Sequence, residues 1–162
     1  MKVTYLIVFF LIIRTQVLSQ VDQLSQGDFL FGKGYYKEAI SAYSNYLETY
    51  PRDAKGNLKL AQCYLFLNKE EEAQKPLFIA FELSKRITFE MYFTRGQYFQ
   101  LCHEYPKALK DFKNVPITGN PQVRKKIMEC EAGIRSIKKP IDVNIETLGM
   151  LINSSKNDVL PK

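Results

Sequence analysis

Apolar side chains recur every three or four residues along most of the chain. The stretch "YKEAISAYSNYLETY" is an example, and its apolar positions are Ala39, Ile40, Tyr43, Tyr46 and Leu47. This spacing puts the side chains on one face of a helix. Similar stripes lie before and after it, separated by short polar segments such as "GKGYY", "NKEEEA" and "HEYPKA", which we interpret as turns. The pattern predicts an all-α chain of short helices.

The stripes repeat at spacings of 34 and then 35 residues. A small residue, a large apolar residue, an alanine and a second large apolar residue return at matching places in three successive segments. The matched sets are Gly27, Ala61 and Gly96; Leu30, Tyr64 and Phe99; Ala39, Ala73 and Ala108; and Tyr43, Leu77 and Phe112. A repeat of this length cannot bury its apolar face alone, so we expect stacked units whose packing these residues form.

The repeat resembles the tetratricopeptide repeat (TPR), in which a small residue lets two antiparallel helices approach closely and a proline ends the unit. Pro51 stands where the family has its proline, whereas Lys85 takes that place in the second segment. The family's tryptophan is missing. The resemblance covers about residues 20–118 and predicts three helix-turn-helix units in a helical solenoid.

A further apolar stripe follows in "QVRKKIMECEAGIRSIKK". If a fourth unit starts at Pro121, Cys130 takes the place that Cys63 has in the second unit. A second helix cannot follow, because Pro140 interrupts the pattern. We therefore expect residues 119–139 to form a helix that caps the solenoid.

The first residues read as an export signal. Lys2 is followed by an apolar run over residues 5–13, which is far shorter than the ~20 residues that a membrane-spanning helix needs. We predict a signal peptide over residues 1–19. Without it the chain has 21 basic and 17 acidic residues, and its basic clusters lack interleaved aromatic residues, so we expect solvated surfaces and no nucleic-acid binding.

Candidate chemistry is sparse. His103 is the only histidine and stands in a turn beside Glu104, where a solvated or capping role is expected. The acidic run of residues 70–72 is explained by the start of a helix. The sequence has no Gly-rich phosphate loop and no metal-ligand spacing. We therefore expect no enzymatic activity, no cofactor, no metal and no small-molecule substrate.

Three cysteines, Cys63, Cys102 and Cys130, follow the predicted signal peptide. Their number is odd and no C-x-x-C spacing occurs, so we interpret them as buried, unpaired helix residues, with their redox state left open.

The resemblance to TPR proteins implies that the first helices of the units line a concave groove for an extended or helical peptide. By the register of the repeat, the groove residues would be Leu24, Asp28, Phe31, Leu58, Gln62, Leu65, Phe66, Phe93, Gln97 and Gln100. The alternative is that several of these side chains pack against the neighbouring unit instead. The Lys and Asn clamp of chaperone-binding repeats is not expected, because Leu24, Asp28 and Leu58 are among the corresponding positions.

The final segment carries a second resemblance. Pro140, "VNIETLG" and "INSSKNDVLP" are similar to the junction, in exported Gram-negative proteins, between a TPR domain and a WD-like β-propeller, often followed by an outer-membrane-protein-A-like peptidoglycan-binding domain. This implies a periplasmic, outer-membrane-associated scaffold that holds an envelope component, for instance of a secretion or gliding apparatus. Peptidoglycan would be bound only through missing C-terminal domains.

On this interpretation residues 140–162 are a linker or the first propeller strand, and we expect them to be disordered or loosely docked, because an isolated strand cannot satisfy its backbone. Two alternatives stay open. The chain could be a small secreted repeat protein complete at Lys162, or an accessory subunit with a tightly bound catalytic partner.

Overall fold

The computed structural model describes residues 23–139, and within them the backbone forms seven helices and no strand. The predicted signal peptide and the tail from residue 140 lie outside the described residues. The helices are that of residues 23–32, α2 (Tyr36–Thr49), α3 (Ala54–Phe66), α4 (Glu70–Leu83), α5 (Phe89–Leu101), α6 (Tyr105–Phe112) and α7 (Pro121–Lys138). The prediction of an all-α solenoid of three helix pairs and a capping helix is confirmed.

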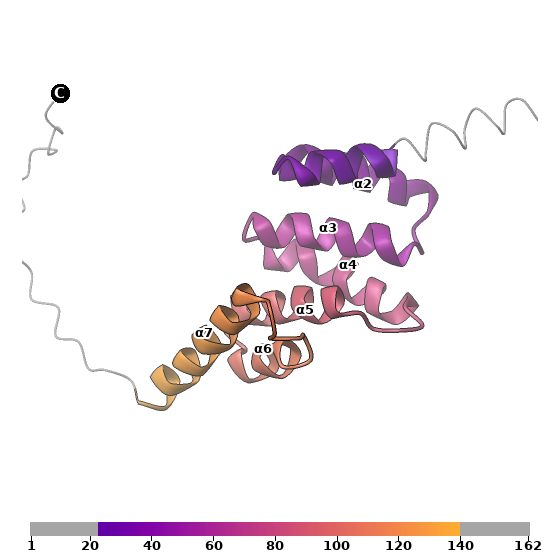
Figure 1. Ribbon diagram of the computed structural model, residues 1–162. Helices are drawn as coiled ribbons and strands as arrows, with labels where there is room; N and C mark the ends of the chain where they lie inside the picture. The colour runs from indigo at the N-terminus through magenta and orange to yellow at the C-terminus, as the bar shows by residue number, and fades with distance from the viewer. Residues whose placement is uncertain (1–22, 140–162) are drawn as a thin grey trace, which may run out of the picture.

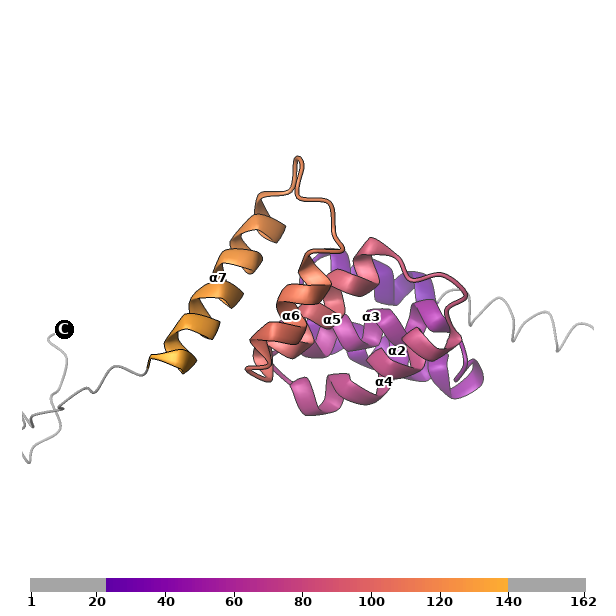
Figure 2. The same cartoon turned by 90° about the horizontal axis from the view of Figure 1, so that it is seen from below.

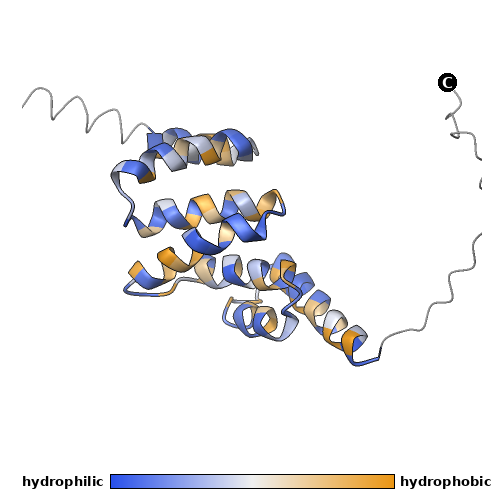
Figure 3. Cartoon of the chain, turned by 180° about the vertical axis from the view of Figure 1, so that it is seen from behind, coloured by the Kyte–Doolittle hydropathy of each residue, from blue (hydrophilic) through white to orange (hydrophobic). Residues whose placement is uncertain are grey.

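Neighbouring helices pack side by side in chain order, so that the units stack along one direction (Figure 1). The most extensive packing joins α3 to α4 and α5 to α6, which are the helix pairs of the second and third units. Helix α7 packs against α6, and its C-terminal end extends away from the other helices (Figure 2). The helices carry both hydrophobic and hydrophilic residues (Figure 3), as expected for helices that bury one face and expose the other.

The two kinds of helix begin in different ways. Helices α3, α5 and α7 each follow a capping side chain, and Asp53, Thr88 and Asn120 accept a hydrogen bond from the backbone N–H three residues later. Helices α2, α4 and α6 follow tight turns instead. Because α4 starts at Glu70 and α6 at Tyr105, these turns are shorter than the polar segments that we interpreted as turns.

Each tight turn contains one residue with positive φ. These residues are Gly34, Asn68 and His103, with φ angles of 79°, 53° and 58°. Glycine adopts this conformation without strain, and asparagine and histidine tolerate it better than most other residues. His103 is exposed, and its Nδ1 atom lies 3.0 Å from the Tyr105 hydroxyl. Its exposed place in the turn agrees with the solvated role expected for it.

Within a unit, a small residue on the first helix faces a large ring on the second. A Cβ atom added to Gly27 would stand 2.6 Å from the ring of Tyr43, and one added to Gly96 would stand 2.6 Å from the ring of Phe112. In the second unit the matching residues are Ala61 and Leu77, both fully buried. Alanine, which is larger than glycine, therefore faces leucine, which is smaller than tyrosine or phenylalanine, as close packing requires.

The other predicted packing residues also lie in the interior. Ala39, Ala73 and Ala108 are fully buried, whereas Leu30, Tyr64 and Phe99 are half-buried and pack against the core clusters.

Helix α7 closes the stack with one of its faces. Cys130 is fully buried in a cluster with Ala108 and Phe112. On other sides of the helix, Met128 and Ile137 are 62% and 65% exposed. The helix therefore buries one stripe and leaves the rest in solvent, as expected for a cap.

The cysteines differ from the prediction at one position. Cys63 and Cys130 are buried inside helices, but Cys102 is half-buried and forms the C-cap of α5 rather than a position within a helix. All three are free thiols. Burial raises the pKa of Cys63 to about 12 and also raises the pKa of Cys130, so both buried thiols are poor nucleophiles at neutral pH.

Within residues 23–139, no helix is both long and apolar enough to cross a membrane, and no cluster of three or more His, Cys, Asp or Glu side chains could hold a metal ion.

Candidate peptide-binding groove

The first helices of the three units and α7 are tied to one another by polar side chains. We call the surface that carries these ties the first-helix face. At the N-terminal end of this face, the Asp28 carboxylate accepts a hydrogen bond from the Tyr43 hydroxyl at 2.7 Å and one from Lys55 Nζ at 2.9 Å. These bonds connect the first helix to its own partner α2 and to α3 of the next unit.

A second tie joins α3 to α5. Lys59 Nζ lies 2.8 Å from Glu90 Oε1, and the Gln62 amide donates to the same oxygen at 3.0 Å and to the Thr94 hydroxyl at 3.0 Å. Gln62 is 8% exposed and Thr94 is 1% exposed. Thr94 in turn donates to the backbone carbonyl of Glu90 at 2.8 Å. The buried amide is therefore fully occupied inside the protein.

A third tie joins α5 to α7. The Gln100 amide donates to Glu129 Oε2 at 2.8 Å, and Lys126 Nζ lies 3.2 Å from the same oxygen. Lys125 Nζ is 3.9 Å from the other carboxylate oxygen of Glu129. Helix α7 is thus part of the first-helix face as well as the cap of the stack.

The carboxylates in these ties are held in their charged form. Burial by itself raises the pKa of Asp28 and of Glu90, but the hydrogen bonds from Lys55 and Tyr43 to Asp28, and from Lys59 and Gln62 to Glu90, outweigh burial and leave both pKa values below the ordinary range. The hydrogen bond from Gln100 is the largest influence on Glu129, whose pKa is also lowered.

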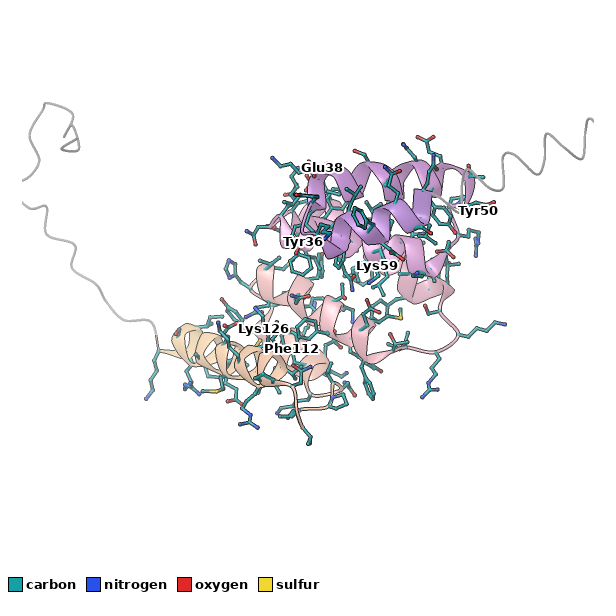
Figure 4. The ribbon with its side chains drawn as sticks, turned by 45° about the horizontal axis from the view of Figure 1, so that its top comes forward. Tyr36, Glu38, Tyr50, Lys59, Phe112 and Lys126 are labelled. Carbon is teal, nitrogen blue, oxygen red and sulfur yellow. The ribbon has the colours of Figure 1, made fainter. Side chains whose placement is uncertain are left out.

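Three aromatic rings gather at the end of α3. Tyr36 and Phe66 are stacked with ring centroids 4.5 Å apart and an interplanar angle of 3°, and Phe31 meets both rings edge-on. Lys59 Nζ lies 5.0 Å from the centre of the Phe31 ring. Figure 4 labels Tyr36, which belongs to α2 of the first unit, and Lys59, which belongs to α3 of the second. Phe66 is 50% exposed, so one large apolar side chain of the cluster is available to a partner.

Two hollows open between α3, α5 and α7. The first has a volume of about 210 Å³ and is lined by Phe66, Phe93, Gln97, Gln122, Lys125, Lys126 and Glu129. The second, of about 270 Å³, is lined by Leu65, Asn68, Gln97, Gln100, Leu101 and Lys126. They share Gln97 and Lys126, so they adjoin each other, and together we call them the α5–α7 groove. Lys126 comes from α7 (Figure 4).

The structure distributes the ten predicted groove residues over three environments. Phe66, Phe93, Gln97, Gln100 and Leu65 line the α5–α7 groove, although Leu65 is only 6% exposed and Phe93 also packs against Phe112. Asp28, Gln62 and Phe31 lie on the same face but are occupied by other side chains of the chain. Leu24 packs against the core of the first unit, and Leu58, 6% exposed, lies in the core of the second.

Leu58 therefore takes a packing position, as does Leu65 beside the groove, and half-buried Leu24 packs against the core of the first unit. The sequence alone left open the alternative that several of the ten residues pack inside the protein instead of lining a groove, and this alternative applies to part of the set. Whether the remaining residues bind a peptide stays a prediction.

Sequence reasoning missed the contribution of α7 to the groove. The equivalence of Cys130 with Cys63 places Lys125, Lys126 and Glu129 at the positions of Leu58, Lys59 and Gln62. This signal could have identified them. They were missed because residues 119–139 were interpreted only as a capping helix.

No family model matches the chain. Its fold is similar to that of the first TPR domain of the human RPAP3 protein, with 21% identity, 75% of this chain and 97% of that chain covered, and a TM-score of 0.64. It is also similar to the second TPR domain of human RPAP3 in complex with the HSP70 peptide SGPTIEEVD, with 23% identity, 70% and 96% covered, and a TM-score of 0.59.

A third similar structure is the Sgt2 TPR domain from Aspergillus fumigatus, with 14% identity, 81% and 91% covered, and a TM-score of 0.63. In all three cases the helices of this chain match nearly the whole of the other domain. The chain therefore has the fold of a TPR domain.

Proposed function

We propose that this protein is a non-enzymatic protein-binding scaffold whose first-helix face holds a peptide segment of a partner. The observation that carries the proposal is the α5–α7 groove, which combines an exposed aromatic side chain, Phe66, with polar side chains along its wall. Grooves of this composition suit a peptide, since an apolar anchor supplies affinity and polar groups fix the register.

Two further observations support this function. The ties between the first helices fix the shape of the face before any partner arrives, which lowers the entropic cost of binding. In addition, the second TPR domain of human RPAP3, which has a similar fold, is described in complex with a peptide.

The proposed place of action is the bacterial cell envelope. The pattern of residues 1–19 supports export, and the resemblance of residues 140–162 to the junction before a β-propeller supports a periplasmic, outer-membrane-associated protein. The partner would then be an envelope complex, such as a secretion or gliding apparatus. Peptidoglycan would be reached only through further C-terminal domains.

Site-specific photocrosslinking in the native cells tests the binding function. A photoreactive amino acid placed at Phe66 should give a discrete crosslinked product, whereas the same amino acid at Phe78, which is 41% exposed and lies on α4, should not. Equal crosslinking at both positions, or at neither, would count against the first-helix face as the binding surface.

Loss of the anchor side chain provides a second test on any partner identified in this way. Phe66→Ala should weaken its binding by about tenfold or more, because a buried aromatic anchor contributes about 2 kcal/mol at an interface. Phe89→Ala removes a ring that is 60% exposed and lines neither hollow, so it is a matched control. Unchanged binding by Phe66→Ala would refute the assignment of the anchor.

The location is tested separately, by fractionation of the native cells with an antibody against the repeats. Sedimentation of the antigen with peptidoglycan would support an anchored envelope scaffold. A freely soluble exported form would favour a small secreted repeat protein, and a cytoplasmic form would refute export.

A further inference from the structure

The α5–α7 groove contains an amide group without a hydrogen-bond partner among the described residues. Gln97 is half-buried and lines both hollows, and its side chain makes no hydrogen bond to any residue among 23–139. Two other glutamines of the first helices behave differently, since Gln62 donates to Glu90 and Thr94, and Gln100 donates to Glu129. Gln122 of α7 also lines the first hollow, but it is exposed, whereas Gln97 is half-buried. A primary amide offers both a donor and an acceptor, which is the complement of a peptide backbone unit.

The charge of the groove is also unbalanced. Two other carboxylates of the first-helix face have one ammonium partner each, Lys55 for Asp28 and Lys59 for Glu90. In the α5–α7 groove two ammonium groups share the single carboxylate of Glu129, and Gln100 already donates to it. Lys125 is 78% exposed in its side chain. The groove therefore has an excess positive charge facing solvent.

The apolar end of the groove lies beside these groups. Phe66 and Phe93 line the same hollow as Lys125 and Lys126, so an apolar side chain and an acidic side chain of one ligand could be bound within a few residues of each other. Gln97 lies in the wall that joins the two hollows. Apolar contact, a backbone hydrogen bond and a charge pair are thus available within the same groove.

We propose that the α5–α7 groove binds an extended segment of a partner protein in which an apolar side chain stands next to aspartate or glutamate. The apolar side chain packs against Phe66 and Phe93, the backbone pairs with the Gln97 amide, and the acidic side chain meets Lys125 and Lys126. This inference rests on the proposed function and names the chemistry of its ligand. The recognised negative charge is that of a side chain within the ligand's sequence, and it is bound at the α7 end of the solenoid. The positions compared above with the Lys and Asn clamp, Leu24, Asp28 and Leu58, are not involved.

Selection of short random peptides displayed on phage tests this directly, with protein purified from cells that express the full 162-residue chain. We expect the selected peptides to share an apolar residue adjacent to Asp or Glu. Their affinity should fall as salt is added, because the charge pair is solvent-exposed.

Variants then locate the binding site of a selected peptide. Lys125→Glu/Lys126→Glu should weaken binding by about tenfold or more, because it turns an attraction into a repulsion. Gln97→Ala should weaken it by about threefold to tenfold, the effect of losing one neutral hydrogen bond. Lys37 is an exposed residue of α2 outside the groove, so Lys37→Glu should leave the affinity for the peptide unchanged. Circular dichroism of each variant confirms that the fold is retained.

The outcomes separate this inference from the proposed function. Selected peptides without acidic residues, or with affinities insensitive to the lysine and Gln97 variants, would overturn the inference and leave a peptide-binding function at another part of the face. If Lys37→Glu weakened peptide binding as much as the double lysine variant, the effect would reflect the overall charge of the protein and not the groove, and the inference would again be overturned. If no peptide is selected the inference fails, and crosslinking at Phe66 then decides the proposed function.

Discussion

Replacing Gly96 by alanine should destabilise the protein although alanine is the better helix former. Gly96 lies in the interior of α5, and an added Cβ would stand 2.6 Å from one carbon of the Phe112 ring and 2.8 Å from another. Carbon atoms at optimal contact are about 3.5–4.0 Å apart. Phe112 is fully buried, so its ring cannot swing into solvent to relieve the clash.

The magnitude follows from two opposing effects. Alanine in a helix interior is favoured over glycine by about 1 kcal/mol. Overpacking of a dense core costs about 1–3 kcal/mol, and the upper part of this range applies because the ring is enclosed on all sides. We therefore expect Gly96→Ala to lower the free energy of unfolding by about 1–2 kcal/mol.

The second unit shows which pair of residues would avoid this clash. The second unit has Ala61 and Leu77 at the places of Gly96 and Phe112, and both are fully buried. Phe112→Leu alone should cost about 1–2 kcal/mol, because it leaves a small cavity. The double variant Gly96→Ala/Phe112→Leu copies the second unit, so the added methyl group should fill part of that cavity. We expect the double variant to be more stable than the sum of the two single effects by at least about 1 kcal/mol.

Urea unfolding of the full chain, followed by far-UV circular dichroism, measures all three variants. Gly32→Ala is the matched control, since nothing lies within 4 Å of the added Cβ. It should leave stability unchanged or slightly raised. If Gly96→Ala is as stable as the parent protein, or if the effects of the two substitutions are simply additive, the contact between Gly96 and Phe112 does not set the packing of the third unit.

Three other predictions concern polar and thiol groups. Arg95 forms two hydrogen bonds of 2.7 Å with Asp111, whose side chain is 4% exposed. Asp111→Asn should therefore lower the free energy of unfolding by about 2 kcal/mol in the same urea assay. This is less than the ~3–5 kcal/mol of a fully buried pair, because Arg95 is partly exposed. The pKa of Glu90 is lower in the folded protein than its ordinary value of 4.5, so its stabilising contribution is complete above that pH and is lost as pH falls through the folded pKa. Glu90→Gln should therefore reduce the loss of stability on acidification, and an unchanged pH profile would contradict the tie between α3 and α5. In the folded protein a small alkylating reagent should modify Cys102 before the fully buried Cys63, and mass spectrometry of the labelled peptides reads the order.

The repeat could be predicted because its signal lies in the sequence itself. Packing of two helices requires a small residue opposite a large one, and this requirement returns every 34 or 35 residues as Gly27, Ala61 and Gly96. The turn residues Gly34, Asn68 and His103 follow the same spacing. Neighbouring units contact each other in a regular way, so a local pattern was enough to give the fold of the described residues.

The binding surface could be predicted only in part. The register placed Leu58, Gln62 and Phe66 together on the first helix of the second unit, but it could not assign each side chain to the interior, to a neighbouring residue or to solvent. That assignment depends on which partner stands opposite. Glu90 and Thr94 of the next unit occupy Gln62, whereas Phe66 has solvent on one side.

The sequence by itself determined the helices, their pairing and the order of the units, because periodic patterns within about 35 residues encode them. Only the tertiary structure decided where a ligand could bind. Gln62, Gln97 and Gln100 look alike in the sequence, yet two donate to carboxylates on neighbouring helices and Gln97 has no partner among residues 23–139. The physical reason is that a free hydrogen-bonding group or an unbalanced charge is a property of several helices together, and no single helix encodes it.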